Sequence, residues 1–145
     1  MIKLKIVDEA SFEEVVDLSL SSQDERRVAS NTYSLAQAWL YGEQVRPYAV
    51  YNLDQVVGFL LLWMHPEEQK WLIWRLMIDQ KHQNNGYGKE VLRQVIKMAQ
   101  KDASCHRLVA DYVIGNHRMR GMLESLGFSS KGPSGNEVVM ELFVK

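Results

Sequence analysis

The sequence predicts an α/β protein (an α+β mixed sheet) in which helices cover one mixed sheet. The chain has 145 residues, the usual length of one domain, so we expect a single domain over residues 1–145. Strand-like and helix-like periods alternate in the order β-α-α-β-β-β-α-β-α-β-β. The strand segments are too apolar to leave both faces of a sheet in water, so helices are needed to cover it.

Composition and net charge narrow the classes of function. Hydrophobic residues make up 46% of the chain and charged residues 24%, which is typical of a globular protein and argues against disorder. The formal net charge of -1 gives no electrostatic case for nucleic acid, which normally requires a basic surface. We therefore expect no nucleic-acid partner.

The chain also lacks the marks of a membrane or disulfide-bonded protein. Its longest apolar run, Val56 to Met64, is strand-sized and far below the ~20 residues of a membrane span, so we expect no membrane partner. The N-terminus leads straight into a strand-like alternation and has no signal-peptide core. Cys105 is the only cysteine, which excludes an internal disulfide and favours a buried structural thiol over a nucleophile. A cytoplasmic protein is expected.

The first third of the chain predicts a strand and two helices. The strand covers residues 3–7, and Ser11 with Glu14 three residues later forms a capping-box pattern at the start of the first helix. The second helix runs from about residue 24 to residue 40, and Pro47 marks its end. Apolar residues at helical spacing are available for its inner face: Val28, Ala29, Ala36, Trp39 and Leu40.

Three apolar runs in the middle of the chain predict consecutive strands. They cover residues 48–51, 56–64 and 71–78, and the links between them are short and contain turn-forming residues. Strands joined by such short links are antiparallel neighbours.

A polar loop at residues 79–85 then leads into a helix at residues 86–101. This helix carries the clearest 3.6-residue pattern in the sequence. Its apolar stripe consists of Val91, Leu92, Val95, Ile96, Met98 and Ala99.

The remaining segment predicts a strand, a helix and a closing hairpin. The strand covers residues 108–113, and Asn116 is a good N-cap for a helix that Gly127 ends in a left-handed conformation. Residues 128–131 and 137–144 form the hairpin over a Gly-Pro-Ser-Gly turn.

The segment from Met77 to Lys89 is the most informative for function, because it joins a strand to the start of a long amphipathic helix. The first amides of a helix have no internal partners and carry partial positive charge. Gly86 and Gly88 let the backbone approach a phosphate closely, and Lys89 adds a cation. A diphosphate site is therefore plausible, and a glycine-containing helix start without a ligand is an equally good interpretation of the loop alone.

Two common phosphate loops do not fit this segment. A P-loop that ends at residues 88 and 89 requires glycine at position 83 and serine or threonine at position 90, where the chain has Gln83 and Glu90. A dinucleotide fingerprint that begins at Gly86 requires a small residue at position 91, where the chain has Val91, and a place in an early βαβ unit.

The loop does match the pattern [Gln/Arg]-x-x-Gly-x-[Gly/Ala], and it resembles the GNAT superfamily of N-acetyltransferases, whose element order is similar along almost the whole chain. More narrowly, the chain looks like the bacterial spermine/spermidine acetyltransferases. The segments that carry this second likeness are Trp71, Arg75-Leu76-Met77-Ile78-Asp79, His82-Gln83, Gly86-Tyr87-Gly88-Lys89, Asn116, Gly127-Phe128 and Glu137-Val138-Val139-Met140.

The resemblance implies acetyl-CoA as co-substrate. The backbone of Leu76, Met77 and Ile78 would pair with the pantetheine arm, and Asn116 would lie beside that arm where the fourth and fifth strands separate; a plain helix cap is the alternative for Asn116. The pyrophosphate would be held by the amides of Gln83, Asn84, Asn85, Gly86, Tyr87, Gly88 and Lys89.

The resemblance also implies direct attack of an amine in a ternary complex, without an acyl-enzyme. The amine must first lose a proton, because polyamine nitrogens are largely protonated near neutrality. The oxyanion that forms needs hydrogen-bond donors, and a kinked strand amide near Met77 would supply one.

The chain departs from the family pattern at two positions. Most relatives have a tyrosine acid where this chain has Leu123, and many have a carboxylate on the fourth strand where it has Trp74. The acid is then Tyr112, Tyr87 or a water, or is absent. Our candidate catalytic residue is Tyr112, at the end of the fifth strand, and the alternative is an aromatic side chain packed at a strand end.

The acceptor is expected to be a small-molecule primary amine, with spermidine and spermine first. A polycation favours carboxylates at the cleft mouth. The candidate acids are Asp24, Glu25 and Glu67, and also Glu68 and Asp111. Ordinary solvated surface acids are the alternative. Three nearby arginines, Arg26, Arg27 and Arg46, would oppose a polycation, and helical spacing favours core packing for Trp39.

Two other functions remain open on the sequence alone: acetylation of a protein or antibiotic amine, and non-catalytic binding of acetyl-CoA. The superfamily often forms homodimers, but this sequence gives no independent indication of its oligomeric state. We expect no metal, because His65, His106 and His117 show no metal-ligand spacing.

Overall fold

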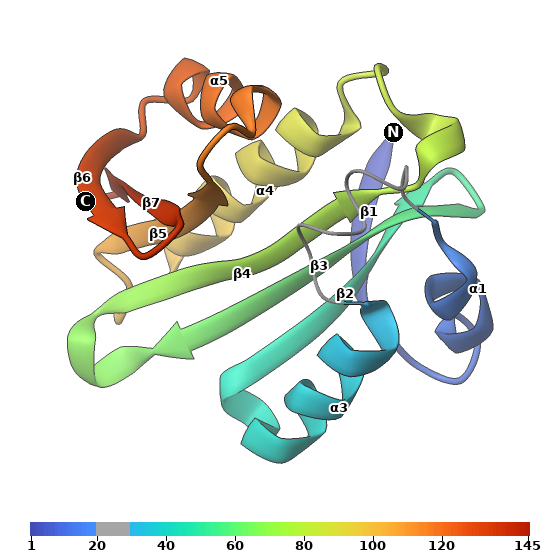
Figure 1. Ribbon diagram of the computed structural model, residues 1–145. Coiled ribbons are helices and arrows are strands. Elements are labelled where there is room, and N and C mark those ends of the chain that lie inside the picture. Colours follow the sequence, from blue (N-terminus) through green and yellow to red (C-terminus); the bar gives the residue numbers. More distant parts are fainter. Residues whose placement is uncertain (20–29) are drawn as a thin grey trace.

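The computed structural model describes residues 1–19 and 30–145, in which one seven-stranded mixed sheet is covered by helices (Figure 1). The sheet has the order β1-β2-β3-β4-β5-β7-β6. The strands are β1 (Ile2–Ile6), β2 (Val45–Asn52), β3 (Gln55–His65), β4 (Lys70–Ile78), β5 (Arg107–Val113), β6 (Ser129–Ser134) and β7 (Glu137–Phe143). The helices are α1 (Phe12–Asp17), α3 (Asn31–Tyr41), α4 (Tyr87–Lys101) and α5 (His117–Ser125). The predicted fold class is confirmed.

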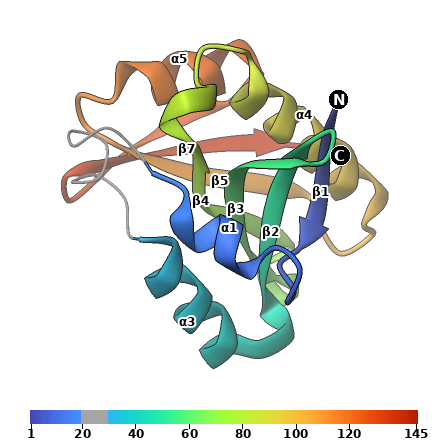
Figure 2. The same cartoon turned by 90° about the vertical axis from the view of Figure 1, so that its right-hand side faces the viewer.

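The two faces of the sheet have separate cores. Both views place α4 and α5 on one face and α1 and α3 on the other (Figures 1 and 2). The larger core lies under α4, whose predicted stripe is buried at Val91, Leu92, Val95 and Ala99. The smaller core includes Phe59 of β3. Covering both faces explains why the strands are so apolar.

The central strands form the predicted antiparallel meander, and β2 pairs with β3 and β3 with β4. β2 begins at Val45, three residues earlier than expected, so Pro47 lies within this strand instead of ending a helix. The hairpin of β6 and β7 is also present, but its turn follows Ser134, because β6 continues past Gly132 after a bulge.

The start of α1 differs from the capping box predicted at Ser11 and Glu14. The Ser11 side chain does not cap the helix; its hydroxyl accepts the Asp8 amide at 3.1 Å. The Asp8 carboxylate instead accepts the amides of Ala10 and Ser11, at 3.0 and 3.2 Å. Asp8 therefore folds the turn before the helix, a role that aspartate fills well.

The inner face of α3 is the largest error of the sequence analysis. The helix begins at Asn31, with Ser30 as its N-cap, and the predicted part before residue 30 lies outside the described residues. Trp39 is 83% exposed and Leu40 68% exposed, and Ala36 is exposed as well. The buried residues are Asn31, Ser34 and Ala38.

The side chains of α3 that face the sheet are small or polar, because they form hydrogen bonds to α1 and to β4. Asn31 donates its Nδ2 to the carbonyl of Val15 at 2.9 Å, and Ser34 accepts from Arg75 at 3.1 Å. Two stripes of α3 have helical spacing, and hydrophobicity alone predicts the wrong one as the buried face. Among the described residues, no helix is both long and apolar enough to span a membrane.

Candidate functional site

The most unusual feature of the sheet is the separation of β4 from β5. The two strands are parallel, and they pair only where Lys70–Ile73 faces Arg107–Ala110. β4 continues to Ile78 and β5 to Val113 without further pairing between them. In Figure 1, β4 runs on beyond β5 toward the loop that precedes α4. A sheet interior thus contains an open strand edge.

A bulge in β4 lies at the point of separation. Leu61 of β3 faces Arg75, while the next residue, Leu62, faces Ile73. Trp74 is therefore the extra residue, and a bulge of this kind bends its strand and increases its twist. The kink that the sequence analysis placed near Met77 lies three residues earlier.

The open edge of β4 presents backbone groups. The Asp79 amide donates to a β3 carbonyl at 2.7 Å, and the Met77 carbonyl lies against Gly58 of β3. Alternate residues of an antiparallel strand direct their backbone groups to opposite sides. The backbone groups of Leu76 and Ile78 consequently face the open edge.

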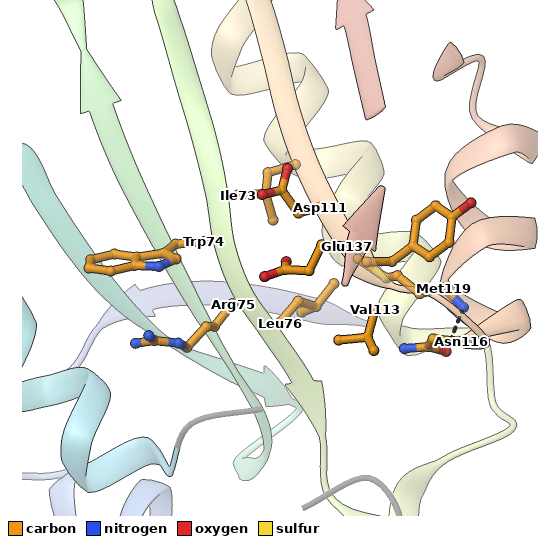
Figure 3. A pocket seen from close by; sticks show the side chains of 10 residues that line it. Ile73, Trp74, Arg75, Leu76, Asp111, Val113, Asn116, Met119 and Glu137 are labelled. Carbon is orange, nitrogen blue, oxygen red and sulfur yellow. Dashed lines mark hydrogen bonds between the residues drawn. The ribbon is translucent and has the colours of Figure 1, made fainter. Parts of the chain in front are cut away.

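A cavity of about 240 Å³ lies between the separated strands. Residues from β4, β5, β7 and the start of α5 line it, and Figure 3 shows their side chains. They are Ile73, Trp74, Arg75, Leu76, Asp111, Tyr112, Val113, Asn116, Met119 and Glu137. The sequence analysis named Leu76, Tyr112 and Asn116 of these as site residues.

The start of α4 carries free amides, as predicted. Gly86 is the N-cap, with φ 77°, and no side chain caps the helix. The first backbone bond joins the Glu90 amide to the Gly86 carbonyl at 3.1 Å. The N–H groups of Tyr87, Gly88 and Lys89 therefore have no partner inside the helix, and the helix dipole adds positive charge there.

Side chains hold the base of this loop against its neighbours. The buried Asp79 carboxylate accepts the Ser19 amide at 2.8 Å. Gln83 donates to the carbonyl of Ile78 at 3.0 Å and accepts from Arg118 of α5 at 2.8 Å. Gln83 thus links the end of β4 to Arg118 of α5.

The unusual backbone conformations of the loop explain its composition. Asn84 has φ 68°, and Asn85 donates to the carbonyl of His82 at 3.0 Å. Gly86 is needed for its positive φ, where an L side chain is strained. Gly88 serves packing, because a Cβ there would lie 3.3 Å from the Met122 sulfur of α5. The phosphate approach suggested for Gly88 by the sequence stays a prediction.

Asn116 caps α5 and also lines the cavity, and its place beside a pantetheine arm stays a prediction. Its Oδ1 accepts the Met119 amide at 3.2 Å, which caps α5, and its side chain also lines the cavity (Figure 3). Within the described residues, no acceptor binds its Nδ2. A polar donor at the cavity wall is therefore available.

Two carboxylates in the cavity are the main residues that the sequence analysis undervalued. Asp111 of β5 and Glu137 of β7 both point into the space between β4 and β5 (Figure 3). Among the described residues, the Asp111 Oδ1 is buried without a hydrogen-bond partner. Burial raises the pKa of the Asp111 carboxyl above its ordinary value, and the positive charge of Lys70 reduces this effect. The sequence analysis named Asp111 only as one of five candidate acids and gave Glu137 no role, because the pairing of β5 with β4 and β7 brings the two carboxylates together.

The two tyrosines considered as acids have different surroundings. Tyr112 lines the cavity and also packs against the larger core. The Tyr87 hydroxyl accepts from Asn52 of β2 at 3.0 Å and does not line the cavity. Leu123 is fully buried in the larger core, so the position of the usual tyrosine acid is apolar here.

An aromatic cluster lies on the α3 side of the cavity. Trp74 stacks on Trp63 with ring centroids 4.6 Å apart, and Tyr41 lies 4.8 Å from Trp63. The Arg75 guanidinium lies 4.6 Å over the Trp74 ring and donates to Ser34 of α3. Burial lowers the pKa of Arg75 from its ordinary value, but an arginine stays charged.

The sequence analysis also predicted Asp24, Glu25 and Glu67 as acceptor-binding residues. Asp24 and Glu25 lie outside the described residues. Glu67 belongs to the turn between β3 and β4, and it is not among the residues that line the cavity. Cys105 is fully buried, and burial raises the pKa of its thiol, as expected for a structural cysteine.

The β3–β4 turn brings His65 close to two glutamates, a grouping that the spacing of the histidines alone did not indicate. His65 Nδ1 lies 3.9 Å from a Glu67 oxygen and 3.8 Å from a Glu68 oxygen. These ligand atoms all lie within 4.8 Å of one another, in the part of the chain described here. Both glutamates are exposed, and Glu68 also pairs with Lys70 at 3.4 Å. The cluster is explained as surface ion pairing.

Comparisons with known proteins agree with the fold. A family model described as the acetyltransferase (GNAT) family matches residues 12–128. No curated protein sequence is significantly similar to the chain.

Similar solved structures share the fold at low identity. Spermidine N-acetyltransferase from Vibrio cholerae, in complex with CoA and spermine, has a TM-score of 0.78 and 12% identity, over 98% of this chain and 95% of that one. The ribosomal-protein-S18-alanine N-acetyltransferase from Escherichia coli has a TM-score of 0.77 and 15% identity, over 100% and 95%. The aminoglycoside acetyltransferase AAC(6')-Ib with coenzyme A has a TM-score of 0.80 and 14% identity, over 99% and 95%.

Proposed function

Because the chain belongs to the acetyltransferase (GNAT) family, we propose that it transfers the acetyl group of acetyl-CoA to a primary amine in a ternary complex. The observation that carries the proposal is the open edge of β4, which runs from the cavity to the free amides at the start of α4. A molecule with an amide-containing arm and a diphosphate matches this arrangement, with the arm at the strand edge and the diphosphate at the helix start.

The residues present fit acetyl-CoA. The backbone groups of Leu76 and the amide of Ile78 face the open edge, where the arm would pair as an additional strand does, while the Ile78 carbonyl accepts from Gln83. The amides of Tyr87, Gly88 and Lys89 would hold the pyrophosphate. Bound there, acetyl-CoA supplies an activated acyl group on a sulfur that leaves readily.

The residues at the cavity then orient the reacting groups. Backbone amides at the bulge around Trp74 and the Nδ2 of Asn116 are donors available to an oxyanion. Cys105 is buried in the larger core, away from the cavity, which favours direct attack over an acyl-enzyme. Tyr112 is kept as the candidate acid for the departing sulfur.

For the acceptor we propose a polyamine, spermidine or spermine. The cavity carboxylates Asp111 and Glu137 favour a cationic amine, and the Trp74 and Trp63 rings offer faces for a second ammonium group. The positive charge of Arg75, which lies over the Trp74 ring, repels a polycation. The acceptor would therefore bind with its ammonium groups toward Asp111 and Glu137.

Two measurements test the proposal. Calorimetry should show saturable binding of coenzyme A, and no binding would remove the assignment. Release of free thiol from acetyl-CoA is then followed with spermidine, spermine, an alanine-initiated peptide and an aminoglycoside. Turnover with polyamines supports the acceptor proposed here, and turnover only with another amine replaces it. Coenzyme A binding without any turnover would identify a non-catalytic binding protein.

A further inference from the structure

The position of Asp111 in the cavity suggests a role in the reaction, and this role rests on the proposed function. Ile73 and Ala110 form the last pair between β4 and β5, so Trp74 and Asp111 are the first residues after the strands separate.

We propose that Asp111 is the residue that accepts the proton of the attacking amine. The carboxylate points into the cavity between β4 and β5 (Figure 3). Its Oδ1 is buried and has no hydrogen-bond partner among the described residues. A buried polar atom without a partner destabilises a fold, so its presence requires an explanation. An ammonium group in the cavity provides the missing donor.

The charges around Asp111 are consistent with this role. The residues of β4 and β7 that bear charge near it are Lys70, Arg75 and Glu137. Lys70 pairs with Glu68 at 3.4 Å, and Arg75 is directed to α3. No salt bridge neutralises Asp111 within the described residues. Its low solvation makes it a stronger base than an ordinary aspartate, which suits proton transfer near neutral pH.

The proton balance of the step is complete. The ammonium gives one proton to Asp111, and the neutral amine forms a C–N bond at the acetyl carbonyl carbon. The C–S bond then breaks, the departing sulfur takes a proton from the Tyr112 hydroxyl, and the second proton of the nitrogen restores that hydroxyl. Asp111 returns its proton to solvent, so the net products are the amide, the thiol and one proton.

The test compares Asp111→Asn with Asp54→Asn, which removes an exposed carboxylate in the β2–β3 turn. With spermidine at pH 7, we expect kcat/KM to fall roughly 100-fold or more in the first variant and to stay unchanged in the second. The wild-type value should level off above the pKa of Asp111. The value for Asp111→Asn should keep rising about tenfold per pH unit until the amine itself deprotonates, near pH 10.

A second measurement does not depend on turnover. Carboxyl carbon NMR of the protein without acetyl-CoA should show one aspartate that titrates above the ordinary range, moves on addition of spermidine and disappears in Asp111→Asn. Because Asp111 lacks a hydrogen-bond partner, its replacement should leave the melting temperature equal or higher. Asp111→Ser serves as a second variant if the first does not fold.

The results separate the two proposals. Wild-type turnover with an unchanged rate and pH profile in Asp111→Asn overturns the role of Asp111 and leaves the acetyltransferase assignment intact. An Asp111 signal that titrates in the ordinary range and ignores spermidine also overturns the role. If the wild-type protein binds no coenzyme A and releases no thiol with any amine, both proposals fall together.

Discussion

Replacement of Gly58 by alanine tests the contact that positions the open edge of β4. A Cβ on Gly58 would lie 2.5 Å from the Met77 carbonyl oxygen and 2.8 Å from the Ile78 Cδ1. Close carbon–oxygen contacts are normally about 3.3 Å, so β3 and β4 must separate locally by ~0.8 Å. Overpacking of this kind costs roughly 1–3 kcal/mol of the free energy of unfolding.

The expected effect on melting follows from chain length. An unfolding entropy of about 2.1 cal/mol/K per residue gives ~0.3 kcal/mol/K for this chain, so 1–3 kcal/mol lowers Tm by roughly 3–10 °C. Because the displaced residues belong to the open edge, the Kd for coenzyme A should also rise, by about tenfold if one hydrogen bond is lost. Differential scanning calorimetry and isothermal titration measure the two quantities.

Gly121→Ala is the matched control for Gly58→Ala. No atom lies within 4 Å of a Cβ on Gly121, which is inside α5 and has an ordinary helical backbone. Alanine is favoured over glycine there by about 1 kcal/mol, so Tm should rise by ~3 °C with no change in the Kd for coenzyme A. If Gly58→Ala melts with the wild-type protein, the close approach of β3 and β4 is not present and the reasoning is refuted.

Four further predictions concern the loop, the core and the cavity. Gly86→Ala, at φ 77°, should cost about 1 kcal/mol and weaken binding of coenzyme A, measured by titration; equal affinity would contradict the role of this turn. Burial opposes ionisation of Glu141, but hydrogen bonds from Arg107 and Lys131 outweigh it and lower its pKa. This stabilisation is present above the unfolded-state pKa of about 4.3 and is lost as pH falls through the lower folded-state pKa. Glu141→Gln should therefore destabilise by roughly 1.5–3 kcal/mol at pH 7 and by less in acid, and a pH-independent difference in urea unfolding would exclude this cause. The native Cys105 thiol should react with a thiol reagent only on unfolding, so rapid labelling of the folded protein counts against its burial. Tyr112→Phe should lower kcat at least tenfold if the hydroxyl protonates the departing sulfur, and an unchanged kcat across the pH range rejects that role.

The sequence predicted the elements whose residues interact locally. The stripe of α4 extends over about two and a half turns, and four of its six members are buried as the period requires. The loop before α4 was identified because helix amides and glycines have meanings that do not depend on distant residues. The three-strand meander was predicted for the same reason, since short links leave antiparallel pairing as the only geometry.

The errors concern contacts between residues that are distant in the sequence. The stripe of Trp39 and Leu40 is more hydrophobic than the stripe of Asn31, Ser34 and Ala38, but the second faces the sheet. The deciding contacts are the bond from Asn31 to α1 and the bond from Arg75 of β4 to Ser34, and neither partner is close in the chain.

Asp111 illustrates the same limit at the candidate site. In the sequence it is one of several acids at the ends of elements. Its significance depends on the register of β4 with β5, which ends at Ala110, and on the bulge at Trp74 on the opposite strand. A one-residue shift of that register would turn the carboxylate to the other face of the sheet.

The bulge at Trp74 links these features to one physical cause. An extra residue bends β4 away from β5 and leaves backbone donors and acceptors unpaired inside a sheet, where they would normally be satisfied. Such groups are stable only if water or a ligand binds them, so the fold accepts a local cost to keep a strand position vacant for an extended molecule. The same bend opens the cavity and leaves the Asp111 oxygen without a protein partner. Removal of the extra residue should close the strand pair, satisfy β4 from within, and abolish binding of coenzyme A while raising the melting temperature.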